Sequence, residues 1–122
     1  LYAITLHSLG NAQHRTGAAA DAVPVLEEAV RVQAEVLREL PDSAEARRNL
    51  ADHHLQLAAA RRKVGNLAAA EDALAGLKAV NPTDANQWVD VAAEWAACSA
   101  DPAQKDKPKA VAAAVDALRQ AR

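Results

Sequence analysis

The stretch RRKVGNLAAAEDALAGLKAVNPTD, residues 61–84, decides the expected fold. It contains the end of one helix, a tight turn at Gly65-Asn66, a second helix over 67–80 and a stop at Asn81-Pro82. Glycine and asparagine are favoured where a chain leaves a helix, and proline cannot continue one. The stretch therefore predicts a helix hairpin followed by a turn into a further helix.

Similar apolar stripes, bounded by Gly, Pro or capping residues, occur on both sides of this hairpin. They predict six helices, over about 1–16, 18–40, 43–64, 67–80, 85–99 and from 107 onward. For the third helix, Asp42 and Glu45 suggest a capping box, although Ser43 is also suited to cap it. The expected inward-facing residues are Val25, Leu26, Ala29, Val30, Val32, Val36, Leu37, Leu40, Leu50, Leu57, Val64, Leu67, Ala70, Leu74, Leu77, Trp88, Val91, Ala92, Trp95, Val111, Val115 and Leu118.

Composition supports an all-α fold. Hydrophobic residues make up 51% of the 122 residues, whereas aromatic residues make up only 2%. Alanine, the strongest helix former, supplies much of the apolar content, and the aromatic residues that favour strands are nearly absent. We expect one domain over residues 1–122.

Charge and targeting signals exclude several classes of function. The formal net charge is −2, and the longest basic run is only Arg61-Arg62-Lys63, so a nucleic-acid surface is not expected. No apolar run of 18 residues and no signal peptide is present, which argues against membrane insertion. The single Cys98 excludes an internal disulfide and fits the cytoplasm. Because the chain contains no Met and starts at Leu1 inside a helical pattern, we expect a fragment of a longer protein.

The spacing of the apolar residues resembles the tetratricopeptide repeat (TPR), whose pattern is W-x2-L-G-x2-Y, A-x3-F and P over about 34 residues. The matching segments are Leu6-x2-Leu9-Gly10-x2-Gln13 with Ala22-x3-Leu26, His54-x2-Leu57-Ala58-x2-Arg61 with Ala70-x3-Leu74 and Pro82, and Trp88-x2-Val91-Ala92-x2-Trp95. This resemblance implies a right-handed α-solenoid of three helix hairpins, with repeats at about 1–40, 41–82 and 83–122.

Two departures from the repeat modify this expectation. Gly17 and Gly65 are 65 − 17 = 48 residues apart, which exceeds the roughly 34-residue repeat. The excess falls at Pro41, so we expect the second and third helices to be elongated together there. The third repeat has Ala110, Ala114 and Ala117 at the signature positions, which is typical of a degenerate terminal repeat.

The chain is also similar, more loosely, to the TPR tails of some bacterial serine/threonine protein kinases. The likeness rests on the Leu-Gly-Asn of residues 9–11 and on an Ala-rich closing hairpin that contains Cys98. No Gly-rich loop, catalytic loop or DFG motif of a kinase is present. The resemblance therefore concerns context alone.

Residues that could carry chemistry have simpler explanations. His7 and His14 are two turns apart on one helix, about 10 Å by helical rise, which is too far for one metal ion. Cys98 is expected to be a small buried hydrophobe, and Trp88 and Trp95 are expected to pack in the core. We therefore expect no enzyme activity, no metal and no cofactor.

The TPR resemblance implies that the first helix of each hairpin lines a concave groove that binds a partner. The matching candidates are His7, Asn11, His14, Arg15, Asp52, Gln56, Arg62, Lys63, Asn86 and Asp90. Arg15, Arg62 and Lys63 are expected to form a basic rim for an acidic peptide, while Asn11 and Gln56 bond its backbone. The family's carboxylate clamp is not expected, because His7, Asn86 and Asp90 replace its Lys and Arg residues.

The sequence thus predicts a protein-protein interaction module. One alternative is a structural or self-association segment that packs against further chain or a second copy. Another is an enzyme or small-molecule sensor, which would require a closed polar pocket with convergent ionisable groups.

Overall fold

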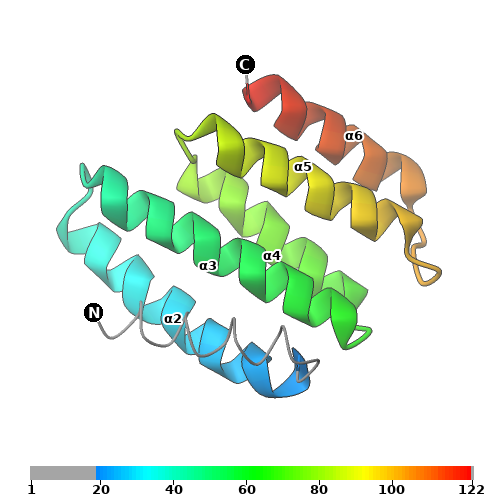
Figure 1. Ribbon diagram of the computed structural model, residues 1–122, viewed down its shortest axis with the longest axis horizontal. Helices are drawn as coiled ribbons and strands as arrows, with labels where there is room; N and C mark the ends of the chain where they lie inside the picture. The colour runs from blue at the N-terminus through cyan, green and yellow to red at the C-terminus, as the bar shows by residue number, and fades with distance from the viewer. Residues whose placement is uncertain (1–18, 122) are drawn as a thin grey trace.

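The computed structural model describes residues 19–121 (Figure 1). They form five helices: α2 (Ala19–Glu39), α3 (Ala44–Lys63), α4 (Leu67–Val80), α5 (Ala85–Ala100) and α6 (Lys107–Gln120). No strand occurs among these residues, so the all-α prediction is confirmed. The helix expected over 1–16 lies outside the described residues.

Each helix packs mainly on its neighbours in the chain. The contacting pairs are α2 with α3, α3 with α4, α3 with α5, α4 with α5, and α5 with α6. Short connections make successive helices antiparallel, so α3 and α5 run in one direction and α4 and α6 in the other (Figure 1). As a result, α3 and α5 share one side of the stack, and α4 and α6 share another.

Side chains at the N-terminal ends explain where the helices start. Ser43, Asn66, Asp84 and Asp106 each accept a hydrogen bond from a backbone N–H in the first turn of the helix that follows. These bonds satisfy donors that have no partner within the helix. The sequence offers Thr83 or Asp84 as the cap of the fifth helix and Asp106 as the cap of the sixth, and in the structure the caps are Asp84 and Asp106. For α3 the cap is Ser43, whose Oγ lies 3.1 Å from the N of Ala46, and the prediction of Asp42 was wrong.

Two residues with positive φ explain where α3 and α4 stop. Gly65 has φ +85°, and Asn81 has φ 55° in the left-handed region. Glycine and asparagine adopt this conformation more readily than other residues. The predicted breaks at Gly65-Asn66 and Asn81-Pro82 are thus confirmed.

The elongated corner at Pro41 is also confirmed. The α2 helix has 21 residues and α3 has 20, and helix rather than loop occupies residues 44–49. Arg47 fastens this corner, because its guanidinium donates to the carbonyl oxygens of Pro41 and Val80, each at 3.2 Å. The tip of the hairpin is therefore tied to the end of α4.

The core is built from alanines with a few large side chains between them. Leu26, Leu74 and Leu77 are among the largest fully buried side chains. Ala22 and Ala70 are buried four residues before Leu26 and Leu74, as the repeat pattern requires. The predicted face of α5, which carries both tryptophans, is buried as well. Small residues let the helices approach closely, and each large residue fills the remaining space.

The predicted inward face of α6 was wrong. Val111, Val115 and Leu118 are 44%, 42% and 51% exposed. The residues that α6 buries are Ala110 and Ala117. Ala110 and Ala117 directly precede Val111 and Leu118, so they lie about 100° away around the helix, where short side chains allow close contact with α5.

Two other predicted core residues, at helix ends, are exposed. Val64 is the C-cap of α3 and Leu40 follows the last residue of α2, so neither continues the stripe of its helix. Gln33 of α2, which was not expected inside, is buried instead. Among the described helices, none is both long and apolar enough to cross a membrane.

Candidate functional site

A groove of about 360 Å³ lies between α3 and α5. Its lining consists of Asp52, Leu55, Gln56 and Ala59 from α3, and Asp90, Ala93 and Glu94 from α5. The structure thus brings together three predicted site residues, Asp52, Gln56 and Asp90, from two helices that are not consecutive. The lining thus combines three apolar side chains, Leu55, Ala59 and Ala93, with four polar or charged ones.

Gln87 holds the two helices in register. Its Nε2 donates to the backbone oxygen of Arg48 at 2.9 Å and to Oδ1 of Asp52 at 2.8 Å. Gln87 is buried, so these bonds form away from water and are costly to leave unmade. Gln87 was not predicted as a site residue, since nothing in its local sequence shows that it faces α3.

Arg62, one of the residues of the predicted basic rim, lies at the C-terminal end of the groove and forms an ion pair with Glu94. Its Nε lies 2.7 Å from Oε1 of Glu94, and the two side chains are only 26% and 16% exposed. This ion pair joins α3 to α5 and neutralises both charges. Lys63 is exposed at the last position of α3, and Arg15 lies outside the described residues.

At the other end of the groove, Asn86 is exposed in the first turn of α5 and does not line the groove. Its backbone N–H donates to Oδ1 of Asp84 at 2.8 Å, which is a capping bond. The remaining candidates, His7, Asn11 and His14, lie outside the described residues. The side chains that the structure places in the groove are therefore fewer than the sequence predicted.

The groove is acidic rather than basic. Its lining carries three carboxylates, those of Asp52, Asp90 and Glu94, and no cationic side chain. Only Glu94 has a cation beside it, the paired Arg62. The observed charge does not favour the acidic peptide that the predicted basic rim required. Lysine, arginine and backbone N–H groups are better matched to these oxygen acceptors.

Cys98 and His54, which both lie outside the groove, have pKa values shifted by burial. Burial raises the pKa of the Cys98 thiol to about 11, and Glu94 and Glu71 add to the increase. A thiol with this pKa is protonated at neutral pH and is a poor nucleophile. Burial, with repulsion from Arg61, lowers the pKa of His54. Within residues 19–121, no group of three or more His, Cys, Asp or Glu side chains could hold a metal ion.

Comparisons with known proteins found no match to a protein-family model, a curated protein or a solved structure.

Proposed function

We propose that this chain is a TPR-like protein-interaction module that binds a peptide segment in the groove between α3 and α5. The observation that carries the proposal is the convergence of Asp52, Gln56 and Asp90 on one groove. The sequence pattern that resembles TPRs selected these positions from separate helices. The groove is open and has no enclosed set of acid, base and nucleophile, which favours binding over catalysis.

The side chains that line the groove indicate which kind of peptide it would bind. Leu55, Ala59 and Ala93 offer shallow apolar contact, Gln56 can bond a peptide backbone, and the carboxylates of Asp52 and Asp90 favour lysine or arginine. The proposed ligand is therefore an extended or helical segment with basic residues. Its affinity falls with added salt, because charges at an open groove are screened within about 10 Å at 0.1 M salt.

A charge-reversal experiment tests this proposal. Peptides selected from a random phage-displayed library on the wild-type chain are measured against Asp90→Lys and, as a matched control, Asp42→Lys in the exposed turn after α2. We expect the selected peptides to be rich in Lys and Arg, and to lose about tenfold or more in affinity for Asp90→Lys only. Acidic selected peptides, or equal losses in both variants, would contradict the proposal.

A second function, self-association, is favoured by one observation. Val111, Val115 and Leu118 form an exposed apolar stripe along α6, next to the face that buries Ala110 and Ala117. A further helix, from a second copy or from more of a parent chain, could bury this stripe. The looser kinase resemblance would make that parent a bacterial serine/threonine kinase, and a cytoplasmic location belongs to the same proposal.

Light scattering distinguishes this second function from the first. If α6 mediates self-association, the wild-type chain is a dimer at micromolar concentration and Val115→Glu is a monomer. Gln120→Glu, which adds the same charge to an exposed polar position of α6, should leave the dimer intact. A monomeric wild-type chain at these concentrations would exclude self-association through α6.

A further inference from the structure

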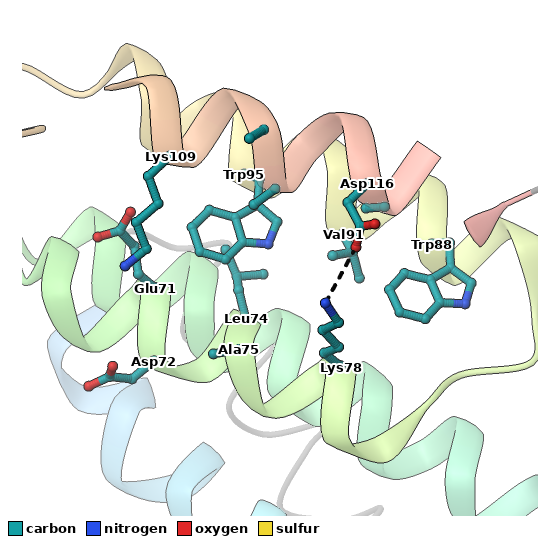
Figure 2. Close-up of a pocket in the computed structure, with 13 residues that line it drawn as sticks. Glu71, Asp72, Leu74, Ala75, Lys78, Trp88, Val91, Trp95, Lys109 and Asp116 are labelled. Atoms are coloured by element: carbon teal, nitrogen blue, oxygen red, sulfur yellow. Dashed lines mark ion pairs between the residues drawn. The ribbon is translucent and has the colours of Figure 1, made fainter. Parts of the chain in front are cut away.

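A second cavity lies on the other side of α5 from the groove. It is a cleft of about 420 Å³ between α4 and α6, with Leu74, Trp88, Val91 and Trp95 among its lining residues (Figure 2). Successive residues of a helix are about 100° apart, so the face with Trp88 and Trp95 lies opposite Asp90. The cleft is thus separate from the proposed peptide groove.

The small side chains of α6 explain why the cleft exists. The pattern Ala70-x3-Leu74 of α4 recurs in α6 as Ala110-x3-Ala114, and the same alignment sets Ala117 against Leu77. In α4 these two leucines are fully buried and fill the space beside the helix. In α6 the side chains that line the cleft include only short apolar ones, those of Ala112, Ala113 and Ala117, and the backbones of α4 and α6 do not approach each other closely. The indole rings of α5 therefore border an open volume instead of a third leucine-packed helix.

An ion pair spans the cleft. Nζ of Lys78 on α4 lies 3.8 Å from Oδ2 of Asp116 on α6, and Figure 2 shows this pair between the two tryptophans. A partner helix could not lie along the cleft without breaking it. A compact ligand can enter beside it, at the end where Glu71 and Lys109 lie next to Trp95 (Figure 2). The volume of the cleft is also in the range of small-molecule sites.

The charges of the residues that line the cleft favour a cationic ligand. The lining includes three carboxylates, Glu71, Asp72 and Asp116, and two ammonium groups, Lys78 and Lys109. With Lys78 and Asp116 paired, two carboxylates remain against one cation. Gln104 donates to Oε2 of Glu71 at 3.2 Å, which fixes that carboxylate near the cleft. Indole faces also attract cations through their negative π surface.

We propose that the cleft between α4 and α6 binds a small organic cation with a flat apolar body, such as an aryl-alkylamine. The apolar body lies against Trp95 and Val91. The ammonium group lies toward Glu71 and Asp72, at the end of the cleft away from Trp88.

The test uses the two tryptophans as reporters, because they are the only tryptophans in the chain and both line the cleft. The probes are 3-phenylpropylammonium and 3-phenylpropanoate, which share one apolar body and differ in charge. Titrations are followed by the two indole N–H signals in ¹⁵N–¹H NMR spectra. We expect saturable shifts with the cation, and about tenfold or more weaker binding of the anion.

Substitutions in α4 and α6 test whether the probe binds in the cleft. Ala113→Leu fills the cleft and should abolish the cation's shifts, whereas Val111→Leu, which enlarges an exposed residue of the same helix, should leave them unchanged. Asp72→Asn, at an exposed position, should weaken binding of the cation without changing the far-UV circular dichroism spectrum. If Ala113→Leu fails to fold, Asp72→Asn still tests whether the cation binds in the cleft.

Equal binding of the two probes would overturn the charge preference. Binding that survives both Ala113→Leu and Asp72→Asn would show that the probe binds elsewhere. If neither probe shifts an indole signal, the cleft is not a small-molecule site, and the proposal fails whatever the result for the peptide groove.

Discussion

Leu74 shows at the scale of one residue how burial, rather than residue type, sets stability. It is 1% exposed between α4 and its neighbours, whereas Leu118 on α6 is 51% exposed. Both are leucines in apolar helical stripes, so a sequence pattern ranks them equally. In the structure only Leu74 loses buried contacts on truncation.

We therefore expect Leu74→Ala to lower the free energy of unfolding by about 2–5 kcal/mol, as in other core truncations. Leu118→Ala should lower it by less than about 0.5 kcal/mol, because it is a surface substitution in this chain. Urea denaturation of both variants measures the difference. Equal losses would mean that the outer face of α6 is buried in solution.

His54 makes stability depend on pH. Its folded-state pKa is lowered from 6.5, first by burial and then by Arg61, so the unfolded chain binds this proton more readily than the folded chain does. The stabilising contribution of the neutral ring is complete above the unfolded pKa, and it is lost as the pH falls through the folded pKa.

The wild-type Tm should thus drop between pH 7.5 and pH 5.5 by more than the Tm of His54→Gln, which cannot take up this proton. Thermal denaturation followed by circular dichroism at the two pH values gives both drops. Because His54→Gln removes only this imidazole, the pH response of the carboxylates is the same in both proteins. It therefore cancels when the two drops in Tm are compared. A larger drop in the variant would show that the sign of the pKa shift is wrong.

At the scale of helices, α3 and α5 are joined by polar contacts as well as by apolar packing. Gln87 bridges them near Arg48, and Arg62 pairs with Glu94 toward their C-terminal ends. Because the Arg62–Glu94 pair is largely shielded from water, removing one partner leaves the other charge poorly solvated.

A double-mutant cycle with Arg62→Ala and Glu94→Ala measures this contact. We expect a coupling energy of about 0.5–3 kcal/mol, the range found for residues in direct contact. The exposed pair Lys78–Asp116 is the matched comparison, and its coupling should be below about 1 kcal/mol. A coupling at Arg62–Glu94 no larger than that of the exposed pair would mean that the groove end is open to water.

At the scale of the whole molecule, packing is local along the chain. Among the described helices, judged by how closely their backbones approach, α3 and α5 each lie against three others, whereas α2 and α6 each lie against one. Stacks of this kind open from their ends, because terminal units have fewer interfaces to lose.

Native-state hydrogen exchange should therefore be slowest in the middle of α3 and α5, and faster in α6 under conditions that favour local opening. Mass spectrometry of peptides that cover each helix measures the order. The part of α5 that carries the tryptophans is the slow-exchanging reference against which the rate of α6 is compared in the same sample. Uniform exchange across all five helices would indicate one cooperative unit instead.

The sequence by itself determined the helices and their ends. The break at Gly65-Asn66, the stop at Asn81-Pro82 and the caps Asp84 and Asp106 depend on backbone conformation and on side chains a few residues away. Such local causes can be read from a short window. The elongated corner at Pro41 followed from spacing alone, because the two added segments flank one proline.

Only the tertiary structure decided which faces meet. A rule that places large apolar residues inside predicts that Val111 and Leu118 of α6 face the core. In the structure α6 packs through alanines instead, because close approach to α5 favours short side chains. Likewise, Asp52, Gln56 and Asp90 line one groove, and Arg62 is paired with Glu94 on another helix. Pairing across 32 residues depends on how helices are placed in space, so the tertiary structure decided the charge at this end of the groove.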